Sequence, residues 1–224
     1  MPELRSVVIT GASRGLGLAS ATHLYERGWR VVGAMRSPDV GLERLRAATG
    51  AAADDPRLIG VRLDLAELPS IAAAAKDIEA AVGAPDVLVH NAGIAAVGCL
   101  EDMPTSVFEE IFATNLLGPI ALTKALLPAM RTAGRGRIVV VSSQGGSRGI
   151  PSISAYSASK GALERWAEAL AEEIAPFARR AVGFDARLLL LGVRFLPARL
   201  LHHLIRLAMG LPRRGSLSER SSNS

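Results

Sequence analysis

Short apolar runs rich in β-branched residues alternate along the chain with segments rich in Ala, Leu and Glu. The short runs are typical of buried strands, and the other segments are typical of helices. We expect strands at residues 6–10, 30–34, 58–63, 86–89 and 137–141, and helices at 16–27, 42–48, 67–82, 106–131 and 153–177. This alternation predicts parallel strands joined by right-handed crossovers, and therefore an α/β fold with an open, doubly wound parallel sheet.

The nearly continuous apolar strands indicate a sheet that is covered on both faces. Ligands bind such sheets beyond the carboxyl ends of the strands, so the residues after each run are candidates for the site. The 224 residues are 49% hydrophobic and 21% charged, and the mean hydropathy is +0.27. These values exclude a disordered or collagen-like chain and predict one domain, which we place at residues 1–193.

The single cysteine, Cys99, cannot form an intramolecular disulfide, which favours a reducing compartment. The first residues show no targeting signal, and the longest stretches without charge fall short of the ~20 apolar residues of a spanning helix. We therefore expect a cytoplasmic protein that does not span a membrane. The four histidines lack acidic or cysteine partners at ligand spacing, so no metal is expected.

The formal charge of +5 is concentrated near the C-terminus, where six arginines and no acid lie between Asp185 and Glu219. Those arginines account for more than the whole net charge, so the main body lacks the basic face of a nucleic-acid-binding protein. Residues 194–214 predict a basic amphipathic helix, which could pack on its own domain, contact an anionic membrane or cover a partner. The polar residues 215–224 predict a disordered tail.

The first expected strand is followed by a glycine-rich turn, Thr10 to Gly17, with the sequence TGASRGLG. Gly11 can make the tight turn, Gly15 allows a pyrophosphate to approach, and Gly17 lets helix and strand touch. The N-terminus of the following helix attracts an anion. Glycines also serve ordinary loops, but this position between a strand and a helix favours a dinucleotide site.

A second candidate site combines Tyr156, Lys160 and Ser143. Tyr156 and Lys160 are four residues apart on one helix and share a face, and Ser143 ends a strand thirteen residues before the tyrosine. A tyrosine with a pKa near 10 is a poor base at neutral pH, and lowering that pKa by ~3 units needs about 4 kcal/mol of preferential stabilisation of the phenolate. A lysine ammonium, a helix N-terminus and an oxidised nicotinamide could supply it together.

The order of these motifs resembles that of the short-chain dehydrogenase/reductase family, whose glycine turn has the form TGxxxGxG. The matching motifs are TGASRGLG at 10–17, Asp64-Leu65, His90-Asn91-Ala92-Gly93, Asn115-Leu116-Leu117-Gly118, Ser142-Ser143 and Tyr156-Ser157-Ala158-Ser159-Lys160. They cover residues 6–178. The resemblance implies a Rossmann-like fold and hydride transfer between a nicotinamide cofactor and a carbonyl or alcohol.

The resemblance also implies catalytic roles. Tyr156 would be the general acid for carbonyl reduction and the general base for alcohol oxidation, and Ser143 would hydrogen-bond the substrate oxygen. Lys160 would also hold the nicotinamide ribose, and Asn115 would organise a water that connects Lys160 to solvent. Strand alternation points the neighbouring Ser142 the other way, toward packing or hydrogen bonding within the fold.

Charge at the end of the second strand predicts the cofactor. An NAD-selective site carries a carboxylate there, whereas this chain has Arg36, and Arg14 lies in the glycine turn. The site therefore favours NADP(H), with the two arginines beside the extra phosphate, unless both are ordinary surface residues. The expected cofactor-binding residues are Gly11, Ser13, Arg14, Gly15, Leu16, Gly17, Arg36, Asp64, Leu65, Asn91, Ala92, Gly93, Tyr156 and Lys160. By the resemblance Asp64 would bind the adenine amine, although it could instead cap the next helix.

The chain departs from the family pattern after Phe177. No Pro-Gly dipeptide occurs, and the sequence passes directly to a segment that resembles the C-terminal region of longer relatives. Residues 181–193 could fill the strand position of the missing segment, or the sheet edge could stay exposed. We expect an oxidoreductase that acts on an apolar carbonyl or alcohol. The resemblance implies a homo-oligomer, because members of this family commonly pair through the two long helices that here begin near Ser106 and Ile153. The alternative is a non-catalytic NADP(H)-binding relative.

Overall fold

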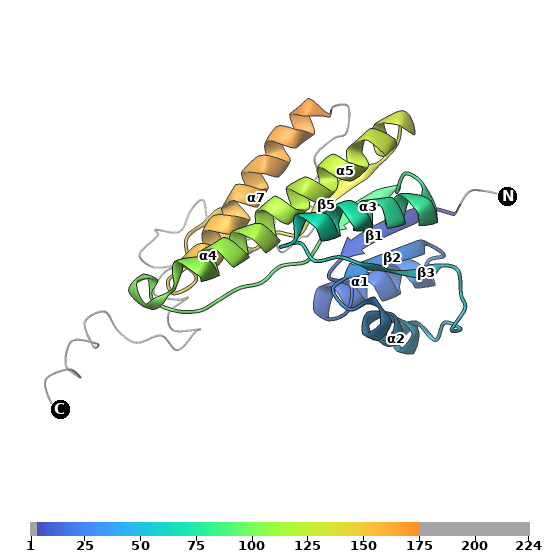
Figure 1. Ribbon diagram of the computed structural model, residues 1–224, viewed down its shortest axis with the longest axis horizontal. Coiled ribbons are helices and arrows are strands. Elements are labelled where there is room, and N and C mark those ends of the chain that lie inside the picture. Colours follow the sequence, from blue (N-terminus) through green and yellow to red (C-terminus); the bar gives the residue numbers. More distant parts are fainter. Residues whose placement is uncertain (1–3, 175–224) are drawn as a thin grey trace, which may run out of the picture. The chain divides into compact units, whose positions relative to one another are not determined.

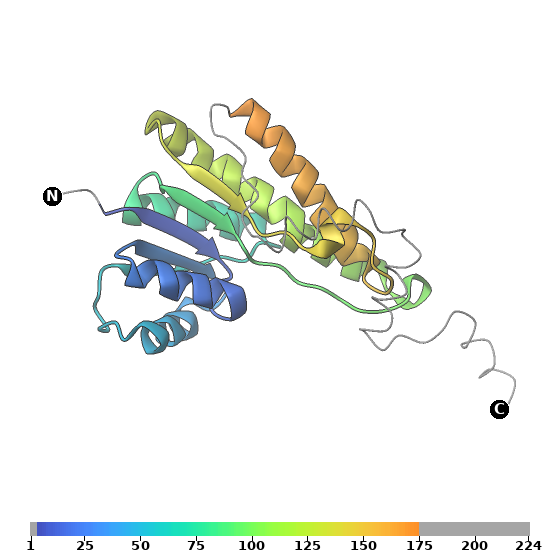
Figure 2. The same ribbon diagram turned by 180° about the vertical axis from the view of Figure 1, so that it is seen from behind.

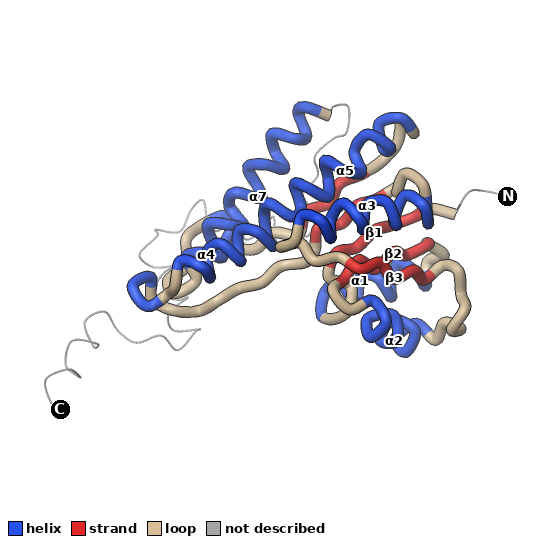
Figure 3. The backbone as a smooth tube through the Cα atoms, viewed as in Figure 1, coloured by secondary structure: helices blue, strands red, loops and turns tan. Residues whose placement is uncertain are grey.

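A computed structural model describes residues 4–174. Its centre is a five-stranded sheet in the order β3-β2-β1-β4-β5, in which every pair of neighbours is parallel. The strands are β1 (Ser6–Thr10), β2 (Arg30–Met35), β3 (Leu58–Arg62), β4 (Val87–His90) and β5 (Arg137–Val140). The chain order reverses between β1 and β4, which makes a topological switch point. The predicted doubly wound α/β fold is thus confirmed (Figure 3).

The helices form a layer on each face of the sheet (Figures 1 and 2). One layer holds α1 (Gly15–Glu26) and α2 (Pro38–Thr49), and the other holds α3 (Leu68–Val82), α5 (Gly118–Thr132) and α7 (Ser154–Glu173). In β1 the neighbours Val7 and Val8 are both fully buried but belong to different core clusters. Their alternation gives each helical layer its own core, as expected for strands covered on both faces.

The helix predicted at residues 106–131 is divided. It begins as α4 (Thr105–Phe112), continues as a π-helical turn η2 (Ala113–Leu117) and ends as α5. Gly118 explains the close contact that follows the turn, because a Cβ there would lie 2.4 Å from the backbone oxygen of Leu65. The missing side chain therefore lets α5 pack directly on the loop after β3.

The other boundaries differ modestly from those predicted. The second helix starts earlier, at Pro38, because proline suits the first turn of a helix, and the last described helix ends at Glu173 rather than at residue 177. Two short helices were not predicted, η1 (Leu100–Asp102) and α6 (Gln144–Ser147). The predicted helix at 194–214, the tail at 215–224 and the possible strand at 181–193 lie outside the described residues.

One described helical stretch, Thr105–Thr132, has the length and composition to cross a membrane, with a mean hydropathy of 1.3 over an 18-residue window. Core packing explains part of this apolar character, since 39% of that window is buried. Leu122 and Leu126 are fully buried in the cluster between the sheet and α3. A helix in the core of a sheet protein passes the same test.

Candidate active site

The glycine-rich turn after β1 has the backbone conformation that its glycines predict. Gly11 and Gly15 have φ values of +71° and +57°, which side-chain-bearing residues rarely adopt. A Cβ on Gly17 would lie 2.3 Å from the backbone oxygen of Gly11, so α1 could not rest on the turn with a larger residue there. Arg14, at the N-cap of α1, makes no side-chain capping hydrogen bond, which leaves this helix end suited to an anion.

Asn91 braces the turn from the end of β4. Its side-chain nitrogen Nδ2 donates to the backbone oxygens of Thr10 and Gly11 at 2.9 and 3.3 Å. The hydroxyl of Thr10 in turn accepts from the backbone nitrogens of Asn91 and Ala92 at 3.1 and 3.0 Å. The predicted cofactor-binding segment Asn91 to Gly93 thus joins the turn, but the side-chain amide of Asn91 is bonded to backbone oxygens. Its role in the structure is to hold the turn in place.

The predicted adenosine side lies at the carboxyl ends of β1, β2 and β3. Arg14 and Arg36 are exposed, and neither forms an ion pair within residues 4–174. Leu16 is 61% exposed at the start of α1, whereas the side chain of Leu65 is buried in the core. A cofactor contact by Leu65 would therefore come from its backbone.

Asp64 shapes the loop after β3. One carboxylate oxygen, Oδ1, accepts from the backbone nitrogen of Ala66 at 3.0 Å, and the Asp64 backbone nitrogen donates to the hydroxyl of Ser70 at 2.8 Å. Asp64 thus forms a local turn before α3 and does not cap the helix itself, whose N-cap is Glu67. In the part of the chain that is described, its second oxygen Oδ2 has no hydrogen bond, which leaves it able to accept one from a ligand.

Asn115 lies in the π-helical turn and is fully buried. Its side chain exchanges two hydrogen bonds of 2.9 Å with the backbone of Ile94 and donates a third, of 3.0 Å, to the hydroxyl of Ser159. The residue therefore joins the loop after β4 to α7. All three bonds use the side chain, so any role in organising a water falls to its backbone, which the π turn displaces from regular helical geometry.

The two serines at the end of β5 point to different partners, as strand alternation predicts. Ser142 donates to Glu164 of α7 at 2.5 Å. Ser143 is the N-cap of the short helix α6 and accepts from the backbone nitrogen of Gly145 at 3.2 Å. The Ser142 hydroxyl is thus committed to the fold. The Ser143 hydroxyl proton is not used in that bond, which leaves it able to donate to a substrate oxygen.

Tyr156 lies in the first turn of α7, half-buried, and Lys160 follows one turn later. The Lys160 ammonium nitrogen Nζ is 5.9 Å from the centre of the Tyr156 ring and donates to the backbone oxygen of Val141 at 2.9 Å. Lys160 is only 3% exposed, and burial lowers its pKa. A Cβ added to Gly93 would lie 3.4 Å from Nζ, so the loop after β4 closes over the lysine.

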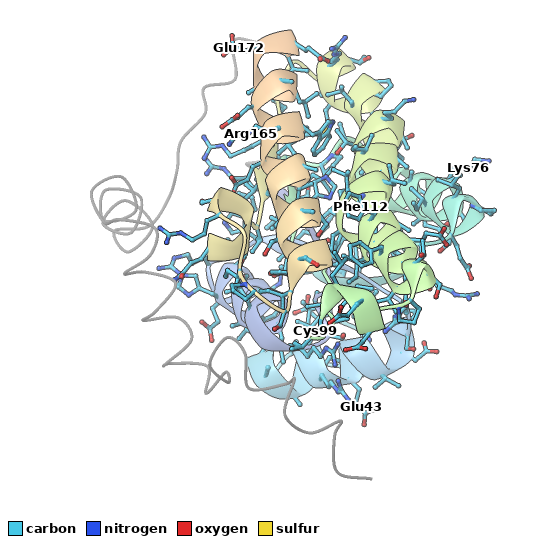
Figure 4. The ribbon with its side chains drawn as sticks, turned by 90° about the vertical axis from the view of Figure 1, so that its left-hand side faces the viewer. Glu43, Lys76, Cys99, Phe112, Arg165 and Glu172 are labelled. Atoms are coloured by element: carbon cyan, nitrogen blue, oxygen red, sulfur yellow. The ribbon has the colours of Figure 1, made fainter. Side chains whose placement is uncertain are left out.

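Sequence reasoning missed two contacts that hold this arrangement. Ser152, just before α7, has φ +67°, an uncommon value for a residue with a side chain, and its backbone oxygen accepts from the nitrogen of Gly98 at 2.9 Å. Ser159 is the partner of Asn115. A serine carries no local signal for either role. Figure 4 looks along this side of the molecule, with α7 in front and Cys99 of the β4–α4 loop near its lower end.

His90, the last residue of β4, is buried beneath the catalytic candidates. Its Nε2 lies 2.8 Å from the hydroxyl of Thr123, and its ring packs edge-on against Trp166 at 6.1 Å between centres. Burial, together with the nearby charge of Lys160, lowers the pKa of His90 to about 3. The imidazole is therefore neutral at physiological pH. The sequence motif placed His90 beside Asn91 but predicted no such role.

A family model described as short chain dehydrogenase matches residues 5–182. The chain is 40% identical over 177 residues to dehydrogenase/reductase SDR family member 7B of Xenopus tropicalis, covering 76% of this chain and 56% of that protein. It is 37% identical over 170 residues to the ketoacyl reductase HetN of a Nostoc species, covering 76% of this chain and 58% of the relative. The chain thus spans little more than half the length of these curated relatives.

Solved structures agree with the sequence matches. A short-chain dehydrogenase from Streptomyces avermitilis has a TM-score of 0.72 at 39% identity, covering 80% of this chain and 64% of the other. A metagenomic short-chain oxidoreductase in complex with NADP has a TM-score of 0.69 at 37% identity, covering 75% of this chain and 76% of the other. With its five-stranded sheet, glycine turn and Tyr156–Lys160 helix, the chain belongs to the short-chain dehydrogenase family of oxidoreductases.

Proposed function

We propose that this protein is an NADP(H)-dependent oxidoreductase that interconverts a carbonyl group and an alcohol, with Tyr156 as general acid and base. The observation that carries the proposal is the buried ammonium of Lys160, held one helical turn from Tyr156 by the backbone oxygen of Val141. A cation in this position stabilises the phenolate over the phenol, which lowers the cost of taking a proton from Tyr156.

The residues at the strand ends fit a dinucleotide. Gly15 has no atom within 4 Å of the position of an added Cβ, so the turn is open where a pyrophosphate approaches, and the uncapped start of α1 favours that anion. Arg14 in the turn and Arg36 after β2 would supply positive charge to the adenosine ribose side of such a ligand, and no carboxylate follows β2 directly. When bound, NADP(H) supplies or accepts the hydride.

The side chains divide the remaining work of carbonyl reduction. Tyr156 gives its hydroxyl proton to the carbonyl oxygen as negative charge develops there, and Ser143 donates a hydrogen bond to the same oxygen. In this proposal Lys160 stabilises the resulting phenolate and uses the N–H donors not engaged by Val141 to bind a ribose hydroxyl of the cofactor. For alcohol oxidation the proton moves back to Tyr156.

Replacing Tyr156 with phenylalanine tests the proposal. Tyr156→Phe removes the proton donor and keeps the ring, so we expect turnover with a panel of ketones and aldehydes to fall by at least about 100-fold. NADPH affinity, measured by fluorescence titration, should change less than about threefold. Tyr25→Phe is the matched control, because Tyr25, the only other tyrosine, bonds Asp55 and Arg57 away from this site.

The outcomes separate the two candidate functions. Turnover that survives Tyr156→Phe removes Tyr156 from the mechanism. Binding of NADPH by the unaltered protein without turnover of any carbonyl would favour the non-catalytic alternative.

A further inference from the structure

A third arginine reaches the glycine turn from α2, an element that sequence reasoning did not connect with the cofactor. The Arg44 guanidinium nitrogen Nη1 donates to the backbone oxygen of Ser13 at 3.4 Å. Ser13 directly precedes Arg14 in the turn. The turn is also tied to the end of β2, because the backbone nitrogen of Gly11 donates to the oxygen of Ala34 at 2.8 Å. Arg44 therefore lies where the turn, β2 and α2 meet.

Packing of α2 fixes the direction of Arg44. The neighbouring Leu45 is fully buried in the core beneath α1 and α2. Gly41 lies one turn earlier, and a Cβ there would come within 1.7 Å of the Met35 sulfur. The helix α2 can therefore pack closely on β2 only with the face that carries Gly41 and Leu45 turned toward the sheet. Arg44 then stays on the exposed rim beside the turn.

The three arginines around this point have no paired acid in the described part of the chain. Arg14, Arg36 and Arg44 are all exposed, and across residues 4–174 none of them forms an ion pair. The acids nearest in sequence are Asp39 and Glu43 of α2, and neither forms an ion pair within the described residues. The side chain of Glu43 points outward from α2 in Figure 4. Like charges gathered at one rim repel each other, and a bound dianion would relieve that repulsion.

We propose that Arg44 is a further specificity-determining residue, which binds the phosphate on the adenosine ribose of NADP(H) together with Arg14 and Arg36. This inference rests on the proposed function, because it assumes that NADP(H) is the cofactor. A guanidinium has five N–H donors, and the bond to Ser13 uses one of them. The remaining donors can pair with phosphate oxygens, whereas the hydroxyl of NADH at that position offers no charge.

Arg44 could instead merely brace the turn. In that case its loss would weaken NADPH and NADH equally, because both place their pyrophosphate on the same turn. The ratio of the two affinities separates phosphate recognition from bracing.

The test is a fluorescence titration of the full chain with NADPH and with NADH. For Arg44→Gln we expect NADPH affinity to fall about 10-fold to 100-fold, the range for one lost charge-assisted hydrogen bond, and NADH affinity to change less than about twofold. Arg44→Lys should recover part of the loss, since it restores the charge without the planar fork. Arg46→Gln is the control, because it makes the same charge change about 200° away around α2.

Competition binding with adenosine 2′-monophosphate and with adenosine 5′-monophosphate measures the contribution of the phosphate on the ribose separately from the rest of the cofactor. Arg44→Gln should weaken only the 2′ compound. An unaltered protein that binds NADPH no better than NADH, or binds neither, would refute the NADP(H) assignment and this inference together. A preference for NADPH that Arg44→Gln leaves unchanged, or an equal loss for both dinucleotides, would refute only the role of Arg44.

Discussion

The buried His90 predicts a specific acid sensitivity of the fold. An unfolded histidine titrates near pH 6.5, whereas burial and Lys160 lower the pKa of His90 to about 3 in the folded protein. Between these values the unfolded chain binds a proton that the folded chain does not. Stability contributed by the neutral imidazole is therefore complete above pH 6.5 and is lost progressively as the pH falls toward 3.

The magnitude follows from the gap between the two pKa values. Each pH unit below 6.5 costs a little over 1 kcal/mol, so acidification from pH 7 to pH 5 should remove about 2 kcal/mol through His90 alone. The carboxyl of Asp55 has a pKa lowered by its bonds to Arg57 and Tyr25, so its contribution is lost only at pH values below this interval. Groups that titrate between pH 7 and pH 5 add to the total loss. A comparison with variants of His90 subtracts those contributions.

The assay is urea unfolding at pH 7 and at pH 5 for the unaltered protein, His90→Asn and His90→Phe. Both variants should be less stable at pH 7, because each disturbs the contacts with Thr123 and Trp166. Their loss between the two pH values should be smaller than that of the unaltered protein by about 2 kcal/mol. His23→Gln, at an exposed position of α1, should keep the full loss.

Equal losses of stability between pH 7 and pH 5 in the unaltered protein and in both variants would refute the assignment of this loss to His90. So would a ring signal of His90, followed by NMR, that titrates between pH 6 and 7. Either result would mean that the imidazole accepts a proton in the folded state and is not isolated from solvent.

Three further predictions concern packing and chemistry. Gly118→Ala should destabilise the fold by about 1–3 kcal/mol in thermal or urea unfolding, because the added Cβ meets Leu65. Gly98→Ala is the control and should lower stability less, because its Cβ makes an ordinary 3.5 Å contact. Equal losses of stability in the two variants would contradict this packing argument. Ser143→Ala should lower kcat by about 100-fold with little change in NADPH affinity. Ser142→Ala should lower the stability of the fold and leave kcat nearly unchanged. The reverse pattern would make Ser142 the catalytic serine and Ser143 the structural one. Lys160→Met should weaken NADPH binding and lower kcat, because it removes the positive charge one helical turn from Tyr156. A kcat and an NADPH affinity equal to those of the unaltered protein would exclude electrostatic assistance by Lys160.

Local patterns along the chain were enough to predict the parallel sheet and the positions of the site motifs. Strand runs, helix segments and glycine turns are set by side-chain period and by backbone freedom, which adjacent residues determine. The order of the strands then brings Gly11, Asn91 and Ser143 to one edge of the sheet, because parallel strands end on the same side. The different directions of Ser142 and Ser143 also follow from strand alternation.

Only the tertiary structure decided how those residues are held. The bonds of Asn115 to Ile94 and Ser159, the reach of Arg44 to Ser13, and the burial of His90 against Thr123 join segments that lie far apart in the sequence. No local period encodes such pairs. Their energies depend on which surfaces the packed helices exclude from water, and that exclusion exists only after the sheet and both helical layers have come together.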